Sequence, residues 1–422
     1  MNSQIERNFL DILGEELIPA MGCTEPIALA YAAAKMREIL GAEPESILAK
    51  CSGNIIKNVR CVKIPHSNGM VGIEAAAVLG AFGGDANQDM EVLKTVTSED
   101  IRRATAFIEA GNCRVEFLDS EIPLHFVIEG HAGSDRALVE VRHSHMNIAR
   151  IEKNGDVLLS NDGEASQGAF ADRSALNLQN IKDFADQVAL EKIAPFYDRV
   201  MHVNMDIAYE GMTGKYGVAI GRMLRETSPD SVFTRMRAFA AAASEARMGG
   251  CDMPVIITSG SGNQGIASTV PVIVYGLEKG FDKEKIYRAL AFSSLLTIFQ
   301  KEYIGKLSAF CGAVSASCAS GAAITYLMNG TLAQIRDTIL NTLADVPGMI
   351  CDGAKTSCAI KIASCLDAAF MAHNLAMRGS AYEPHTGILR DGADETISCV
   401  GAVGRIGMRD TDREILRMML EA

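Results

Sequence analysis

The chain has 422 residues, of which 48% are hydrophobic and 6% aromatic, and it contains no tryptophan. Its formal net charge of −12 argues against nucleic acid as a partner, because phosphate binding needs basic patches. A core built from aliphatic residues, methionine and alanine suits closely packed helices. At this length we expect two or three domains, or one large domain with an insertion.

The cysteine content and the N-terminal segment indicate a reducing compartment. The chain has 11 cysteines, and its first residues, MNSQIERNFLDILGEEL, are amphipathic and charged, unlike a signal segment. No uninterrupted run of about 18 apolar residues is present to span a bilayer. We therefore expect a cytoplasmic protein with no membrane partner, in which clustered cysteines indicate metal binding or catalysis more often than disulfides. The sequence leaves open whether two copies form a homodimer.

Residues 1–45 are expected to form two helices that pack on a larger helical domain. The first, over 4–18, has an apolar stripe at helical spacing and ends at Pro19. The second has Thr24 as its N-cap, which places Cys23 directly before a helix N-terminus. The partial positive charge there favours a thiolate and lowers the thiol pKa. A reactive thiol and a buried cysteine at a turn fit this position equally well.

Residues 46–168 predict an α+β domain inserted after the N-terminal helices. Stretches of alternating apolar and polar residues are separated by Gly, Ser and Asn turns, and amphipathic helices interrupt them. We expect a mostly antiparallel sheet. His143 and His145 are two residues apart on one predicted strand, so their side chains point to the same face. With no third ligand nearby, we interpret them as part of a solvated strand face rather than as a metal pair.

Residues 169–422 predict an all-α domain, because helix-period patterning, Gly and Pro stops and short connections recur throughout. The predicted fold class is thus α+β, with a large helical domain that carries the functional site and a smaller domain of antiparallel sheet and helices.

A glycine-rich turn, SGSGNQG at 259–265, lies between an apolar run and a helix. Successive glycines let backbone N–H groups point to one anion, and the helix N-terminus adds its dipole. Ser259, Ser261, Asn263 and Gln264 add polar side chains, and the array suits a carboxylate. It lacks the GK[ST] ending of a nucleotide loop. A plain flexible turn is the alternative interpretation.

A run of cysteines among Gly, Ala and Ser extends from Cys311 to Cys365. Cys351 follows a Pro-Gly turn and is expected on a loop that leads into a helix. Thiolates near helix starts are suited to a soft metal centre, although the spacing matches neither a zinc ribbon nor a ferredoxin. Cys318 and Cys365 each follow another cysteine by one heptad, which favours core packing.

Five motifs together resemble the L-cysteine desulfidase family, which is related to the iron–sulfur L-serine dehydratases. They are GCTEP at 22–26, SGNIIKNVRCVKIP at 52–65, SGSGNQGI at 259–266, FCGAV at 310–314 and MICDGAK with a following CA.K at 349–361. The motifs span nearly the whole chain. Their order is the one expected for the family.

The resemblance implies a 4Fe–4S cluster bound by Cys311, Cys351 and Cys358, with Cys23 as the catalytic thiol. Cys23 as proton acceptor and Cys23 as a fourth cluster ligand both stay open. The glycine-rich turn and the GNIIKN motif supply the expected substrate contacts. These are Asn54, Lys57, Ser259, Gly260, Ser261, Gly262, Asn263 and Gln264.

The implied reaction is a β-elimination on L-cysteine that gives sulfide, ammonia and pyruvate. L-Serine dehydration by the same cluster chemistry is the alternative, because the two substrates differ in one atom. The last cysteine is Cys399, so the chain lacks the C-terminal thiol of the serine dehydratases, which favours the desulfidase. A non-catalytic iron–sulfur or zinc-binding redox sensor is the alternative from another class.

Overall fold

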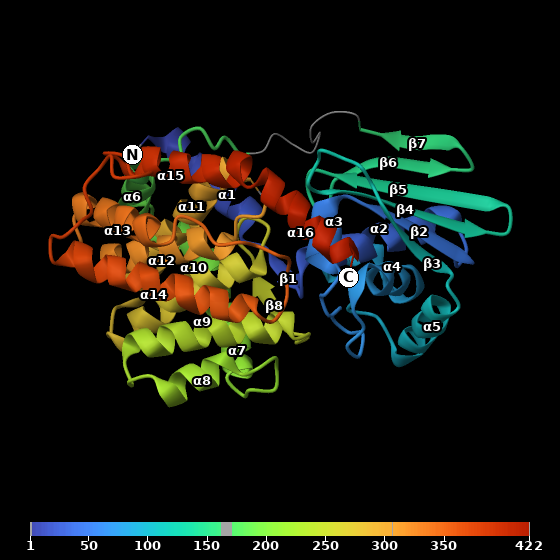
Figure 1. The fold of residues 1–422 in the computed structure, drawn as a ribbon, viewed down its shortest axis with the longest axis horizontal. Helices are drawn as coiled ribbons and strands as arrows, with labels where there is room; N and C mark the ends of the chain where they lie inside the picture. Colours follow the sequence, from blue (N-terminus) through green and yellow to red (C-terminus); the bar gives the residue numbers. More distant parts are fainter. Residues whose placement is uncertain (1, 162–170, 306, 422) are drawn as a thin grey trace.

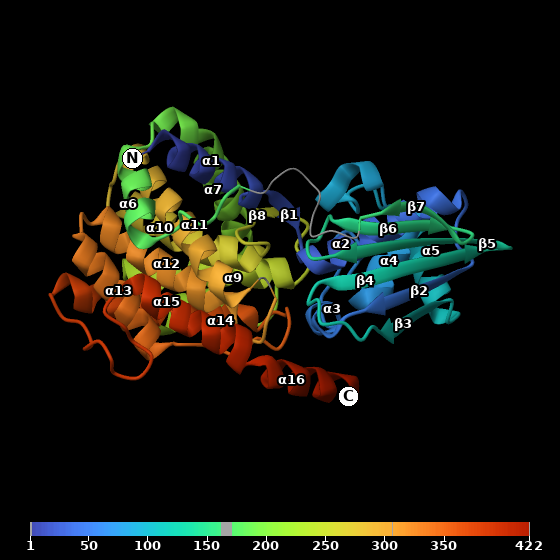
Figure 2. The same ribbon diagram turned by 90° about the horizontal axis from the view of Figure 1, so that it is seen from above.

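The computed structural model describes residues 2–161, 171–305 and 307–421, and within them it forms two units with separate hydrophobic cores (Figure 1). The helical unit contains residues 2–21 and 171–408, and the α+β unit contains residues 24–160. Figure 2 shows the two units side by side, with the sheet entirely in one of them. The α+β fold class expected from the sequence is confirmed.

The helical unit is organised around α12 (Gly312–Leu327), which packs against four other helices. Of its 16 residues, 11 are Gly, Ala, Ser or Cys, so neighbouring backbones approach closely. A Cβ on Gly321 would lie 2.9 Å from the carbonyl oxygen of Ala369. Cys318 and Cys365 are buried in this core, so their predicted packing role is confirmed.

The other helices of this unit follow the chain in order. They are α1 (Ser3–Glu16), α6 (Leu178–Gln187), α7 (Leu190–Gly211), α8 (Ile220–Thr227), α9 (Val232–Met248), α10 (Gly262–Glu278), α11 (Lys283–Ile304), α13 (Leu332–Asp345), α14 (Cys358–Met377), α15 (Ala393–Ala402) and the π-helical turn η2 (Val403–Gly407). In the described part of the chain no helix is both long and apolar enough to cross a membrane.

The α+β unit has a six-stranded sheet in the order β3-β2-β4-β5-β6-β7, antiparallel except for the pair β2 and β3. Helices α2 and α4 pack on the sheet and on each other. The strands are β2 (Ser46–Cys51), β3 (Cys113–Phe117), β4 (His125–Ala132), β5 (Asp135–Arg142), β6 (Ile148–Lys153) and β7 (Asp156–Ser160). The helices are α2 (Thr24–Leu40), α3 (Gly53–Val59), α4 (Gly72–Gly83), η1 (Ala86–Glu91) and α5 (Ser98–Glu109).

One boundary differs from the expected domain division. We expected both helices of residues 1–45 on the helical domain, but only α1 packs there, and α2 lies in the core of the α+β unit. The reason is that α2 is apolar on almost every side and fits between the sheet and α4. Gly80 permits this, because a Cβ there would lie 2.2 Å from the carbonyl oxygen of Ala30. The expected boundary at 168/169 falls outside the described residues.

A short two-stranded sheet, which the sequence did not predict, connects the start of the chain to the glycine-rich turn. Strand β1 (Pro19–Met21) pairs antiparallel with β8 (Pro254–Ile256). Buried Asn204 satisfies the other edge of β8, since its Oδ1 accepts from Ile256 N–H at 2.8 Å and its Nδ2 donates to Ile256 O at 3.3 Å. The pairing fixes Cys23, two residues after β1, beside the turn that follows β8.

The C-terminal helix α16 (Arg409–Glu421) leaves the helical unit and ends beside α3 (Figure 1). Asp412 forms an ion pair with Lys57, whose side chain is 1% exposed. Leu416 packs on Gly53, where a Cβ would lie 2.3 Å from its Cδ2 atom. The helix therefore links the two units.

Candidate functional site

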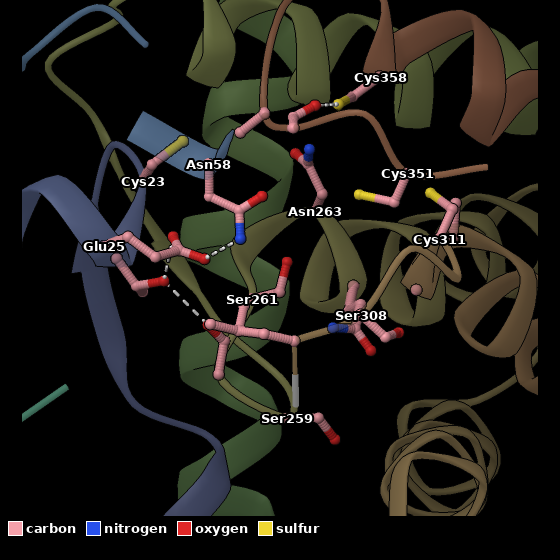
Figure 3. A pocket seen from close by; sticks show the side chains of 18 of the residues that line it. Cys23, Glu25, Asn58, Ser259, Ser261, Asn263, Ser308, Cys311, Cys351 and Cys358 are labelled. Atoms are coloured by element: carbon pink, nitrogen blue, oxygen red, sulfur yellow. Dashed lines mark hydrogen bonds between the residues drawn. The ribbon is translucent and has the colours of Figure 1, made fainter. Parts of the chain in front are cut away.

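A pocket lies where the two units meet, and most of the expected site residues line it (Figure 3). Those residues are Cys23, Ser259, Gly260, Ser261, Asn263, Gln264, Cys311, Cys351 and Cys358. The expected residues Asn54, Lys57 and Gly262 do not line it. In Figure 3 the thiols of Cys311, Cys351 and Cys358 lie on one side of the pocket. Glu25 and Asn58 lie opposite, next to Cys23.

Four helix N-termini converge on this pocket. Cys23, Ser261 and Cys311 are the N-cap residues of α2, α10 and α12, and Cys358 is the first residue of α14. None of these four N-termini has a side-chain cap hydrogen bond, so their first N–H groups are not used by a capping side chain. Each N-terminus carries about half a positive charge, so the pocket favours anions such as thiolates and carboxylates.

Backbone pairing places Cys311 beside Cys351. The amide of Cys311 donates to Met349 O at 2.8 Å and the amide of Cys351 donates to Ala309 O at 2.7 Å. The two thiols are hydrogen-bonded to each other, which lowers the pKa of Cys351 and raises that of Cys311. Cys351 is therefore the member of the pair that ionises more readily.

A glycine shapes the loop between Cys351 and Cys358. Gly353 has φ +95°, and a Cβ there would lie 2.2 Å from the carbonyl oxygen of Lys57, so no larger residue fits. The Cys358 thiol donates to Gly353 O at 3.9 Å. Cys358 also packs against the small buried cluster that contains Cys23. The loop thus connects the two sides of the pocket.

Cys23 differs from the expectation drawn from its helix N-terminus. Its thiol is buried and donates to Met248 Sδ at 3.7 Å. Burial raises the pKa of Cys23 to about 12, Arg247 acts in the opposite direction and Glu25 raises the pKa further. The expected lowering is therefore wrong for this structure, because loss of hydration outweighs the nearby positive charge.

The glycine-rich turn is a tight reversal. Ser259 and Gly260 have φ +50° and +74°, and Thr258 and Ser261 exchange backbone hydrogen bonds at 3.2 and 3.1 Å. Within the described residues, Ser259 Oγ and Gln264 Oε1 are buried without a hydrogen-bond partner. Buried polar atoms are usually paired, so these atoms are available to a polar ligand.

Two buried cations at the pocket were missed by the sequence analysis. Arg247 is 3% exposed, and its Nε has no hydrogen-bond partner in the described part of the chain. Burial lowers the pKa of Lys301 to about 8, while the thiols of Cys351 and Cys311 act in the opposite direction. Each cation lies in the last turn of its helix, where a basic residue is ordinary, so no pattern marked them.

His145 also lines the pocket, contrary to the interpretation of a solvated strand face. It lies in the turn after β5 rather than in a strand, next to the glycine-rich turn. A Cβ on Gly260 would lie 3.6 Å from its Cε1. His143 is exposed, so the two histidines do not act as a pair.

The three expected contacts that do not line the pocket have other surroundings. Lys57 pairs with Asp412, donates to Ser308 O at 3.4 Å and helps to lower the pKa of Cys351. A Cβ on Gly262 would lie 2.3 Å from Arg247 Nε, so this glycine lets the guanidinium approach. Asn54 has a buried Oδ1 without a partner among the described residues.

The donor atoms on the thiol side of the pocket are the kind that the expected 4Fe–4S cluster needs. Within the described ranges, no three His, Cys, Asp or Glu side chains are grouped closely enough to hold one metal ion. A cubane needs a wider arrangement, because its iron atoms lie between the thiolates. The donor chemistry fits, since three thiols line one pocket and four helix N-termini with Lys301 balance negative charge.

Comparisons with known proteins identify the family. The model of the serine dehydratase alpha chain matches residues 87–417, which include the glycine-rich turn and three of the pocket thiols. A UPF0597 protein of Lachnoclostridium phytofermentans is 46% identical over 414 residues, covering 98% of this chain and 99% of that protein. One of Treponema denticola is 43% identical over 420 residues, covering 98% and 97%. The chain therefore belongs to the serine dehydratase alpha chain family.

Proposed function

We propose that the chain is an iron–sulfur-dependent amino-acid lyase that performs β-elimination on L-cysteine. The observation that carries this proposal is the convergence of four uncapped helix N-termini, three of them bearing thiols, on one pocket. Membership of the serine dehydratase family supports lyase chemistry. The reaction removes the Cα proton and expels sulfide from Cβ, and the aminoacrylate that forms hydrolyses to pyruvate and ammonia.

Cys311, Cys351 and Cys358 are the residues that would hold a 4Fe–4S cluster. When bound through three thiolates, such a cluster supplies a Lewis-acidic iron that has no fourth protein ligand. The hydrogen bond from Cys311 lowers the pKa of Cys351 to about 6, so the Cys351 thiolate is accessible near neutral pH. Buried Lys301 offsets the negative charge that ionised thiols bring to the pocket.

The remaining residues bind the substrate and move its proton. The N–H groups at the start of α10, with Ser261 and Arg247, would bind the α-carboxylate, since all of them lie at the pocket. Cys23 takes the Cα proton on Sγ when it is in its thiolate form. Burial raises the pKa of Cys23 to about 12, so the thiol first loses its own proton to solvent, and Arg247 is the cation that stabilises the thiolate so formed.

L-Serine is the second candidate substrate, because the matching family is that of the serine dehydratase alpha chain. Its elimination expels water instead of sulfide, and its ammonium and carboxylate would use the same contacts. The ratio of kcat/KM for the two amino acids decides between them.

The experiment uses protein purified and reconstituted without oxygen, with pyruvate, sulfide and iron measured together. We expect bound iron, pyruvate from L-cysteine with one sulfide for each pyruvate, and loss of turnover in Cys23→Ser with the iron retained. Reconstituted protein that holds iron but turns over neither amino acid contradicts the lyase and supports the redox sensor. Pyruvate formed faster from L-serine than from L-cysteine shifts the assignment to the second substrate.

A further inference from the structure

Glu25 is the only Asp or Glu among the described residues that line the pocket. It lies in the first turn of α2, next to Cys23 and opposite the three clustered thiols (Figure 3). Among the described lining residues, Glu25 is thus the single carboxylate in a pocket whose other charged side chains, apart from the thiols, are the cations Arg247 and Lys301.

Each oxygen of the Glu25 carboxylate accepts a hydrogen bond, and the two bonds fix its orientation. Its Oε2 accepts from Thr24 Oγ1 at 3.1 Å, and its Oε1 accepts from Asn58 Nδ2 at 3.4 Å. Thr24 is in turn near Gly260 O at 3.0 Å, which links the carboxylate to the glycine-rich turn. An ionised carboxylate accepts about four hydrogen bonds, so each oxygen retains a lone pair for a ligand.

No cation among the described residues forms an ion pair with this carboxylate. Among the ion pairs of the described residues none includes Glu25, although ion pairs are frequent elsewhere in the α+β unit. Arg247 also has no ion pair in the described part of the chain, and both charges act on the Cys23 thiol, with opposite effects on its pKa. Two unpaired charges of opposite sign thus lie on the same side of one pocket.

We propose that Glu25 binds the α-ammonium of the substrate and makes the pocket specific for amino acids over hydroxy acids. The inference rests on the proposed lyase function and adds the group that recognises nitrogen. A zwitterion satisfies both unpaired charges at once, with its carboxylate near Arg247 and the start of α10. Its Cα then lies between these contacts, where Cys23 Sγ is the adjacent proton acceptor.

The contact between Glu25 and the α-ammonium also disfavours 2-hydroxy acids as ligands. A 2-hydroxy acid would place a neutral hydroxyl against an ionised carboxylate and leave its charge unbalanced in a partly buried site. Hydrogen bonds to charged groups contribute about 1.5–3 kcal/mol, which corresponds to roughly 10- to 100-fold in affinity. Removal of the charge of Glu25 is therefore expected to erase most of this preference.

The test uses reconstituted full-length protein and two ligands without a leaving group, L-alanine and L-lactate, which differ only in ammonium against hydroxyl. Dissociation constants are measured by calorimetry for wild type, Glu25→Gln and Glu25→Asp, and KM and kcat are measured with L-cysteine and L-serine. Glu38→Gln is the matched control, because Glu38 lies on the same helix and pairs with Lys35 at 3.1 Å, away from the pocket.

We expect Glu25→Gln to weaken L-alanine about 10- to 100-fold, to leave L-lactate within about twofold and to raise KM more than it lowers kcat. Glu25→Asp retains the charge, so its affinity for L-alanine should lie between those of wild type and Glu25→Gln. Equal weakening of both ligands, or none, overturns the assignment of Glu25. Wild-type protein that binds neither ligand and turns over neither amino acid overturns the proposed function and the assignment together.

Discussion

The two units form opposite sides of the pocket and do so by different means. The helical unit presents Cys311 and Cys358 from the starts of α12 and α14, and Cys351 from a segment that is hydrogen-bonded through its backbone to the segment before α12. The α+β unit presents Glu25 and Asn58 from α2 and α3, and His145 from a turn. Cys23 lies where the chain passes from one unit to the other.

This difference separates two kinds of chemistry. The soft thiol donors belong to a tightly packed core, in which a backbone shift of a few tenths of an ångström would be resisted. Glu25 and Asn58 belong to elements at the edge of the second unit, opposite the thiols. Metal binding is thus expected to depend on the helical unit, whereas recognition of the substrate depends on how the α+β unit is placed against it.

The largest expected effect is the loss of iron and turnover when one thiol of the pocket is replaced. Cys351→Ser replaces the thiolate of the hydrogen-bonded pair with a hydroxyl, a much weaker ligand for iron. We expect iron content to fall and turnover to drop by more than the roughly 10- to 100-fold that loss of an outer-shell partner costs. Cys61→Ser, at an exposed cysteine, is the control and should retain both. Full iron and activity in Cys351→Ser would contradict the ligand assignment.

The thiol side was also the part that sequence predicted best. The resemblance to the L-cysteine desulfidase family implied Cys311, Cys351 and Cys358 as cluster ligands, and the structure brings these three thiols to one pocket. The helical character of residues 171–408 followed from local periodicity, since local contacts dominate helices.

The rest of the pocket could not be predicted because it depends on contacts between distant segments. Arg247 and Lys301 resemble ordinary cations at helix ends, and only tertiary packing aims them into the pocket. The pairing of β1 with β8 joins strands too short to show alternation. The raised pKa of Cys23 follows from burial, which a helix-start argument does not include.

The second prediction concerns substitutions that break the ion pair between Lys57 and Asp412, which links the two units. Asp412→Ala leaves Lys57 buried without its carboxylate, whereas Lys57→Met leaves an Asp412 that still reaches solvent. Loss of one partner of a buried pair costs about 3–5 kcal/mol, so Asp412→Ala should lower the thermal unfolding midpoint more than Lys57→Met does. Asp410→Ala, on the same helix with a solvent-exposed ion pair, should change it little. Equal effects of all three variants would show that α16 does not hold the units together.

The third prediction concerns acid sensitivity of the helical unit. Burial lowers the pKa of His373 from 6.5 to about 4, and its Nδ1 is hydrogen-bonded to Thr325 Oγ1 at 2.8 Å. Because the unfolded chain takes up the proton first, stability should be lost as pH falls from about 6.5 to about 4, by about 3 kcal/mol at most.

His373→Asn keeps an amide that is able to pair with Thr325 but does not titrate, so its free energy of unfolding should depend less on pH in this window than that of wild type. The comparison uses denaturant unfolding at pH 7 and pH 5. His202→Asn is the control, because His202 is exposed and should leave the pH dependence unchanged. A wild-type pH dependence that persists in His373→Asn would contradict the role of this histidine.

The smallest effect is expected on the sheet of the α+β unit, away from the pocket. Arg136 donates from Nε and Nη2 to the two oxygens of Glu129 at 2.9 Å each, and this interaction lowers the Glu129 pKa to about 2. The contribution of the ionised pair is complete above the unfolded pKa of about 4.5 and is lost as pH falls towards 2.

Arg136→Met should therefore destabilise the protein by about 1 kcal/mol at pH 7 and by less near pH 3, because Glu129 of the unfolded chain is then protonated and part of the contribution of the ion pair is lost. Iron content and turnover should stay at wild-type values, since neither residue lines the pocket. The measurement is denaturant unfolding at the two pH values together with pyruvate formation. A loss of turnover larger than the loss of folded protein would mean that the sheet transmits strain to Asn58 and His145, and the division of roles between the two units would then fail.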